Sequence, residues 1–213
     1  MPYFKNENVN ILFIHIPKTG GTSLEKYFSE KFNIELNNSA LYDFLNSEIK
    51  EQNKIEINSS LQHMTHNTIM EYKDFFNINY ENLEIITIVR NPYYRVLSDL
   101  FFLKKINKES SKHEVYIAIQ EYITTLWDNH GLPQYLFLMD ENDELIQNIK
   151  IMGTESLQSD MIQLGYTDFD IKTNCNENNI NYNDYLNRDS INLINKYYEK
   201  DFELFGYTKI QNI

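Results

Sequence analysis

The chain has 213 residues, of which 42% are hydrophobic and 14% aromatic. That is enough apolar material for one substantial core, and it excludes a disordered or fibrous protein. The 19 basic and 31 acidic residues give a formal net charge of -12, which argues against a general binder of nucleic acid, because such binding needs accumulated lysine and arginine. A lone cysteine, Cys175, allows no intramolecular disulfide. We therefore expect one globular domain over residues 1–213.

The first ten residues, MPYFKNENVN, lack the cationic and apolar regions of a secretory signal. No apolar run approaches the roughly 20 residues that are needed to cross a bilayer. These two observations predict a cytoplasmic protein without a membrane span.

The first strong element is the run ILFIHI at residues 11–16, whose nearly continuous apolar character is typical of a strand covered on both faces. A glycine turn breaks the run. A helix then follows, in which Leu24 and Phe28 share a face, and Thr22 with Glu25 has the spacing of a capping box. The order is strand, turn, helix.

Apolar runs typical of strands alternate with helical patterns along the rest of the chain. Residues 166–184 are polar and rich in asparagine, which indicates a long surface loop. The alternation of strands and helices predicts an α/β fold, with a central, mainly parallel sheet and helices on both faces. The other expected elements are helix 40–50, strand 55–61, strand 84–90, a helix from Asn91 and Pro92 to about 106, helix 113–127, strand 148–152, helix 155–164 and helix 191–205.

The turn PKTGGTS lies between a buried strand and the start of a helix, where exposed amides and the positive helix end attract an anion. Glycines permit close approach, lysine adds a charge and hydroxyls can donate to phosphate oxygens. In a Walker loop the lysine follows the last glycine, whereas Lys18 precedes both glycines. The predicted anion-binding residues are Pro17, Lys18, Thr19, Gly20, Gly21, Thr22 and Ser23.

The segment FIHIPKTGGTSLE resembles the 5′-phosphosulfate-binding loop of sulfotransferases that use 3′-phosphoadenosine 5′-phosphosulfate (PAPS), especially the carbohydrate branch related to heparan O-sulfotransferases and bacterial family 2 enzymes. The resemblance implies a P-loop-like, three-layer domain. It also implies that Lys18 contacts the 5′-phosphate and the bridging oxygen that leaves the sulfuryl group.

A second anion site is indicated at the end of the strand at 84–90. Two of the three arginines of the chain, Arg90 and Arg95, lie there, and ligands of open α/β sheets bind at strand ends. An arginine followed eight residues later by a serine is similar to the 3′-phosphate-binding segment of the family, which maps onto Arg90 and Ser98. Arg95 either supports this site or lies on a solvated helix face.

Sulfuryl transfer needs a base for the acceptor hydroxyl, and histidine suits that task near neutral pH. His63 and His66 are the candidates, while His15 within the first strand is expected to be a packed structural residue. QHMTH resembles the segment that carries the catalytic histidine in carbohydrate sulfotransferases, which assigns His63 as the base, with His66 as the alternative. One histidine pair without further ligands is not a zinc site, so no metal is expected.

The resemblance implies transfer of a sulfuryl group from PAPS to a hydroxyl, with Lys18 and His63 catalytic and adenosine 3′,5′-bisphosphate as the product. We expect the acceptor to be a carbohydrate or a small molecule, and no nucleic-acid partner. The alternatives are an ATP-dependent small-molecule kinase and a noncatalytic nucleotide-binding module.

Overall fold

A computed structural model describes residues 2–36, 57, 59–125, 127–170 and 181–211. The helix expected over residues 40–50 lies outside these described residues. So do most of the strand expected over 55–61 and the centre of the loop expected over 166–184.

The centre of the fold is a four-stranded sheet in the order β1-β2-β3-β4. The first strand is antiparallel to its neighbour and the other pairs are parallel, which confirms the expected mainly parallel sheet. The carboxyl ends of the three parallel strands therefore meet at one edge, where open α/β sheets bind ligands. The strands are β1 (Tyr3–Lys5), β2 (Asn10–Ile14), β3 (Glu84–Val89) and β4 (Ile149–Gly153).

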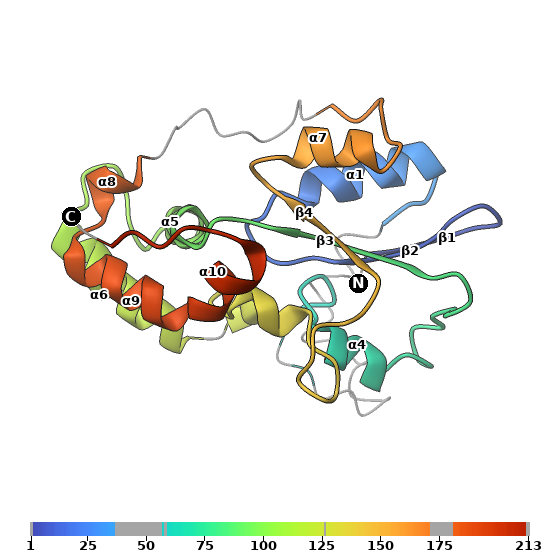
Figure 1. The fold of residues 1–213 in the computed structure, drawn as a ribbon, viewed down its shortest axis with the longest axis horizontal. Helices are drawn as coiled ribbons and strands as arrows, with labels where there is room; N and C mark the ends of the chain where they lie inside the picture. Colours follow the sequence, from blue (N-terminus) through green and yellow to red (C-terminus); the bar gives the residue numbers. More distant parts are fainter. Residues whose placement is uncertain (1, 37–56, 58, 126, 171–180, 212–213) are drawn as a thin grey trace.

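Helices cover both faces of the sheet, as the sequence predicts (Figure 1). On one face lie α1 (Gly21–Phe32) and α7 (Leu157–Gln163), which pack against Ile11 and Phe13. On the other face lie α4 (His66–Glu71) and the 3₁₀ helix η3 (Gln134–Phe137), which pack with Leu12 and Ile14. Neighbouring residues of β2 thus point to opposite faces, and both faces are apolar because both are covered.

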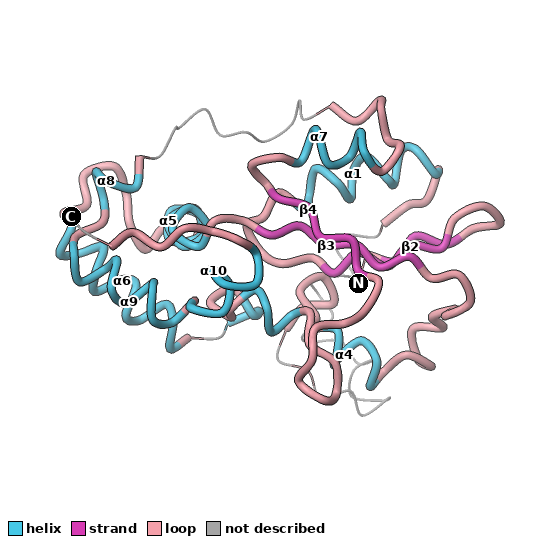
Figure 2. The backbone as a smooth tube through the Cα atoms, in the orientation of Figure 1, coloured by secondary structure: helices cyan, strands magenta, loops and turns pink. Residues whose placement is uncertain are grey.

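A separate block of helices lies beside the sheet (Figure 2). Its core includes Val96, Leu100, Val115, Ile119 and Ile194, all of which are buried. The helices are α5 (Pro92–Phe102), α6 (Lys112–Thr124), α8 (Tyr182–Tyr185), α9 (Arg188–Tyr197) and α10 (Glu199–Phe205).

Several expected boundaries are wrong. The first strand ends at Ile14 rather than at residue 16, and the helix that begins at Pro92 ends at Phe102, where the backbone soon turns through Lys104 at a φ of 55°. The single helix expected over 191–205 is two helices. They meet at Tyr198, a buried residue whose hydroxyl donates to the carbonyl oxygen of Gly131 at 2.9 Å.

Two expected elements differ more. Residues 57 and 59–61 do not form a strand. The loop expected over 166–184 contains the start of the short helix α8. The helix expected over 113–127, the strand over 148–152 and the helix over 155–164 are present with shifts of one to three residues. Within the described part of the chain, no helix is both long and apolar enough to cross a membrane.

Candidate active site

The turn between β2 and α1 forms the first part of the site. Gly20 is the N-cap of α1 at a φ of 93°, and Lys18 has a φ of 66°, so two of its residues adopt the left-handed conformation. No side chain caps the helix, which corrects the capping box expected from Thr22 and Glu25. The 12-residue helix therefore begins at a glycine and has no side-chain cap. Its first backbone amides have the geometry that suits an anion.

Glu25 has a different function from the expected cap, because it lies buried against His15. The His15 Nδ1 atom is 2.5 Å from Glu25 Oε1, and Gln62 Nε2 donates to Glu25 Oε2 at 2.7 Å. Burial opposes ionisation of this carboxyl, but the His15 and Gln62 contacts lower the pKa of Glu25 overall. A Cβ atom on Gly21 would lie 2.5 Å from His15 Nε2, so this glycine is required by the ring that packs against it.

The hydroxyl of Thr19 is used inside the turn. Thr19 is fully buried, and its Oγ1 donates to the carbonyl oxygen of Ile16 at 2.8 Å. The Thr19 hydroxyl therefore donates within the turn in this structure, and its predicted contact with a phosphate stays a prediction. Thr22 is exposed and Ser23 is half-buried at the start of α1, and their role as donors stays a prediction.

Arg90 lies directly against this turn. Its Nη1 atom donates to the carbonyl oxygen of Lys18 at 3.1 Å, and its Nε is buried with no hydrogen-bond partner among the described residues. Burial lowers the pKa of Arg90, and the Glu155 carboxylate opposes that shift. The two anion-binding segments that the sequence predicts are therefore adjacent in space.

Arg95 does not lie on a solvated helix face, because it is 1% exposed. Its Nε donates to the carbonyl oxygen of Pro17 at 3.0 Å, and its two terminal nitrogens donate to the carbonyl oxygens of Leu132 and His130 at 2.9 and 2.7 Å. Arg95 thus ties the start of the turn to the segment after α6. Each of its three side-chain nitrogens donates to a protein carbonyl, which makes it a structural residue.

Lys18 and Ser98 are the remaining residues of the two predicted anion sites. Lys18 Nζ lies 3.9 Å from the centroid of the Phe102 ring. Burial lowers the pKa of Lys18, and the nearby Asp99 carboxylate opposes that shift. Ser98 is half-buried on α5, and no hydrogen bond joins its side chain to Arg90 in the described part of the chain.

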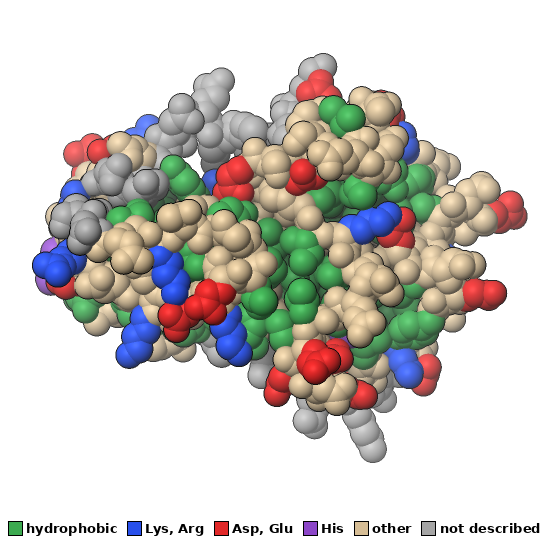
Figure 3. All heavy atoms as spheres, viewed as in Figure 1, with side chains coloured by type: hydrophobic (Ala, Val, Ile, Leu, Met, Phe, Trp, Pro, Cys, Tyr) green, Lys and Arg blue, Asp and Glu red, His purple; other side chains and the backbone are tan. Residues whose placement is uncertain are grey.

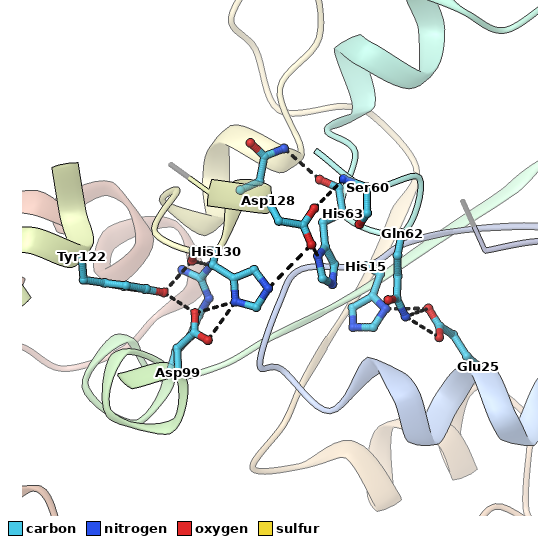
Figure 4. A network of polar contacts seen from close by, with 11 residues as sticks. His15, Glu25, Ser60, Gln62, His63, Asp99, Tyr122, Asp128 and His130 are labelled. Atoms are coloured by element: carbon cyan, nitrogen blue, oxygen red, sulfur yellow. Dashed lines mark hydrogen bonds and ion pairs between the residues drawn. The ribbon is translucent and has the colours of Figure 1, made fainter. Parts of the chain in front are cut away.

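His63 lies at the centre of a buried polar network (Figure 4). Its Nδ1 is 2.7 Å from Asp128 Oδ2, while the backbone amide of Ser60 donates to Asp128 Oδ1 at 2.5 Å. Burial lowers the pKa of His63 to about 4, against the opposing effect of Asp128. Although burial opposes it, the hydrogen bonds from His63 and Ser60 lower the pKa of Asp128. His63 is therefore a neutral imidazole beside an ionised carboxylate at neutral pH.

A second histidine-carboxylate pair lies next to the first. His130 Nδ1 is 2.8 Å from Asp99 Oδ1, and the Tyr122 hydroxyl donates to Asp99 Oδ2 at 2.5 Å. Burial opposes ionisation of Asp99, but the hydrogen bonds from His130 and Tyr122 lower its pKa. The Nε2 atom of His130 is 3.8 Å from Asp128 Oδ2, so the two pairs adjoin at one carboxylate oxygen.

An aromatic bridge connects the lysine to these histidines. The Phe102 ring stacks on His130 with centroids 6.1 Å apart, and the His130 ring meets His63 edge-on at 5.1 Å. Because Lys18 Nζ lies over the same Phe102 ring, Lys18 is connected to His63 through the Phe102 and His130 rings. Trp127 also packs on His130, at 5.2 Å.

His66 lies apart from this network. It is the first residue of α4, and its Nδ1 is 3.3 Å from the carbonyl oxygen of Met139. Burial lowers the pKa of His66, with a smaller opposing effect of Asp140. Within the described part of the chain, the polar contacts of His66 are to the 139–140 segment rather than to the lysine or the arginines.

Sequence reasoning missed Asp128, His130 and Asp99. The segment NHGLPQ includes His130, and ordinary core packing is the favoured explanation of that segment from sequence alone. Asp128 directly precedes that segment. In the sequence, the one sign of this site is an acidic residue followed by asparagine and histidine. The sign is weak, because the partner of Asp128 is 65 residues away.

His63, Asp128 and His130 are also the one group of described residues whose nitrogen and oxygen atoms lie close enough together to hold a metal ion, all within 4.8 Å. Asp128 already accepts two hydrogen bonds, from Ser60 and His63. Each carboxylate oxygen of Asp128 therefore has a hydrogen-bond partner among the described residues.

A cleft of about 420 Å³ opens beside the carboxyl ends of β3 and β4. Val89, Gly153, Glu155 and Tyr207 are among its lining residues. Glu155 Oε1 accepts from the Asn91 amide at 3.0 Å, and its Oε2 accepts from the Tyr207 hydroxyl at 2.9 Å. The cleft therefore borders the segment that carries Arg90.

Comparison with known protein families gives a match over more than half of the chain. The model of the Sulfotransferase family matches residues 1–135, which include the turn, Arg90, His63 and His130. No curated protein matches the chain significantly.

Proposed function

The chain belongs to the sulfotransferase family, and from that premise we propose that it moves a sulfuryl group from PAPS to a hydroxyl of a carbohydrate. The observation that carries the proposal is the contact between Arg90 Nη1 and the Lys18 carbonyl oxygen, 3.1 Å long. It joins the loop predicted for the 5′-phosphosulfate to the arginine predicted for the 3′-phosphate. A ligand with an anionic group at each end fits such a pair.

Two further observations support PAPS as the sulfuryl donor. The Nε of Arg90 is a buried donor without a partner among the described residues, and a phosphate oxygen would satisfy it. The turn also combines a left-handed Gly20 with a helix that begins at Gly21 without a side-chain cap, so an anion could accept from the first amides of the helix. Lys18, Gly20, Gly21, Thr22 and Ser23 would hold the 5′ end, and Arg90 with Ser98 the 3′-phosphate.

PAPS would supply the sulfuryl group and leave as adenosine 3′,5′-bisphosphate. His63 would take the proton of the acceptor hydroxyl, since a neutral imidazole is the form that accepts a proton. Lys18 would stabilise the negative charge on the departing oxygen as a point charge. The contacts favour His63 over His66, because His63 shares the network that reaches Lys18 through His130 and Phe102.

Two exposed aromatic rings support a carbohydrate acceptor. Phe102 is 60% exposed and Trp127 is 55% exposed, although both rings contact the buried His130. Exposed aromatic faces next to a polar site offer large, rigid apolar surfaces to a ligand, and the C-H face of a sugar ring matches them. Figure 3 shows basic side chains in separate groups on the viewed face, which gives a highly sulfated polymer no continuous basic surface there.

The test is incubation of the purified protein with ³⁵S-labelled PAPS and a panel of glycan, small-alcohol and phenolic acceptors. Labelled product that forms with a glycan, and that is lost in Lys18→Ala, supports the proposal. Transfer of label from γ-³²P-ATP instead would indicate the kinase alternative. Lys18-dependent binding of adenosine 3′,5′-bisphosphate without turnover on any acceptor would indicate a noncatalytic module.

A further inference from the structure

We infer that Asp128 is a positioning residue that keeps the hydrogen of His63 on Nδ1, so that the lone pair of the base is presented on Nε2. The inference rests on the proposed function, because His63 is the base assigned there. Asp128 itself would touch neither the donor nor the acceptor.

The hydrogen bonds of Asp128 determine which ring nitrogen of His63 carries the hydrogen. Its Oδ1 accepts from the backbone amide of Ser60 at 2.5 Å, and its Oδ2 lies 2.7 Å from His63 Nδ1. An ionised carboxylate can only accept hydrogen bonds, so the hydrogen between Asp128 and His63 must be on the ring nitrogen. A neutral imidazole has one ring hydrogen, and Nε2 is then the basic atom.

The backbone around Asp128 is built to hold this contact. Asp128 and Asn129 have φ angles of 49° and 59°, which are two successive residues in the sparsely populated left-handed region. Asn129 Nδ2 donates to the carbonyl oxygen of His63 at 2.8 Å. The same turn therefore contacts both the ring and the backbone of His63.

The other charged and titratable groups around His63 have partners of their own. The rings of His15 and His130 meet the His63 ring edge-on at 5.2 and 5.1 Å, and both lower its pKa when charged. His15 pairs with Glu25, and His130 pairs with Asp99. Each imidazole thus has a separate carboxylate, and the close partner of His63 is Asp128.

The substitution Asp128→Asn distinguishes a role of Asp128 in positioning His63 from a role in packing alone. An asparagine has the same shape and tolerates a left-handed backbone, so the fold should persist. It has one acceptor oxygen, whereas two donors face the carboxylate. The Ser60 amide cannot accept a hydrogen bond, so the oxygen must stay with it and the new NH₂ group must face His63 Nδ1. His63 would then carry its hydrogen on Nε2, the wrong atom for a base.

The experiment records the tautomer by long-range ¹H-¹⁵N correlation NMR in ¹⁵N-histidine-labelled protein, with His63 assigned from His63→Asn. We expect hydrogen on Nδ1 in the wild type and on Nε2 in Asp128→Asn. The kcat should fall roughly 100-fold to 10,000-fold, as for loss of a positioned base, with unchanged affinity for adenosine 3′,5′-bisphosphate. Asp168→Asn, which alters a surface pair with Lys31, is the matched control with wild-type kcat.

Asp128→Glu gives an independent comparison, since it keeps the carboxylate and changes the shape. Positioning predicts that Glu retains more kcat than Asn, whereas a packing role predicts the reverse. Hydrogen that stays on Nδ1 in Asp128→Asn, or kcat within threefold of the wild type, would overturn the inference. The tautomer needs no turnover, so a wild type with hydrogen on Nδ1 and no sulfuryl transfer would refute the proposed function alone.

Discussion

Arg90 and Lys18 are 72 residues apart in sequence, yet the guanidinium of one donates to the backbone carbonyl of the other at 3.1 Å. The contact exists because β2 and β3 are parallel neighbours, so the residues that follow each strand meet at the same edge of the sheet. The arginine after β3 therefore borders the turn after β2. A single ligand can contact both segments.

Arg90→Ala should weaken binding of adenosine 3′,5′-bisphosphate by roughly 10-fold to 100-fold, from about 1.5–3 kcal/mol for a hydrogen bond to a charged group. Affinity for adenosine 5′-phosphate should change by less than about threefold, because that ligand lacks the 3′-phosphate. Isothermal titration calorimetry with both nucleotides measures the ratio. Arg188→Ala, at an exposed arginine at the start of α9, is the control. Equal losses for both ligands would mean that Arg90 only supports the turn.

Gly21→Ala should destabilise the protein by about 1–3 kcal/mol, because its Cβ atom would lie 2.5 Å from His15 Nε2. The cause can be isolated in a double-mutant cycle measured by urea unfolding. In a His15→Ala background the ring is absent, so the cost of Gly21→Ala should shrink by more than half. An unchanged cost in that background would show that the helix start itself, rather than His15, requires glycine.

The order of the core elements was predictable because its signals are local. The apolar run of β2, the glycine turn and the apolar face of α1 follow one another within 22 residues. Asn91 and Pro92 mark the start of α5, where the Asn91 side chain accepts from the Tyr93 amide as expected of an N-cap.

Features that depend on tertiary contacts could not be predicted in this way. Glu25 has the spacing of a capping residue, but a buried histidine offers a stronger partner. The sequence allows Arg95 to lie on the solvated face of its helix. In the structure Arg95 is buried and donates to three carbonyl oxygens of segments that are distant in sequence. The pairing of His63 with Asp128 joins residues 65 apart, and no local period encodes such a contact.

The pKa of His63 predicts a specific pH dependence of stability. The folded pKa is about 4, against 6.5 for an unperturbed histidine, so the unfolded chain binds a proton here between these two values and the folded chain does not. The contribution to the free energy of unfolding is full above pH 6.5 and is lost as the pH falls toward 4. His63→Asn can still donate to Asp128 but cannot titrate. Urea unfolding should show a shallower slope for this variant between pH 6.5 and 4.

The matched control is His113→Asn, at an exposed histidine near the start of α6. A His63→Asn variant whose stability falls as steeply as that of the wild type would contradict the lowered pKa. A steeper fall would contradict it more strongly, since it would mean that the histidine binds its proton more tightly in the folded state.

The proposed acceptor surface can be observed directly because Trp127 is the one tryptophan of the chain. Its emission should change when an oligosaccharide acceptor is titrated into protein saturated with adenosine 3′,5′-bisphosphate. Trp127→Ala should raise the acceptor KM about 2-fold to 10-fold, from about 0.5–1.5 kcal/mol for an aromatic stacking contact. Its affinity for the bisphosphate should not change, since the ring contacts His130 rather than Lys18 or Arg90.

Phe102→Ala should raise the acceptor KM by a similar factor, but it should also alter nucleotide binding, because Lys18 Nζ lies over this ring. Phe75→Ala, at another exposed phenylalanine that follows α4, is the control and should change neither constant. If sugars leave the emission of Trp127 unchanged while turnover on a glycan continues, the sugar ring binds elsewhere. The two exposed rings would then have to be explained without the acceptor.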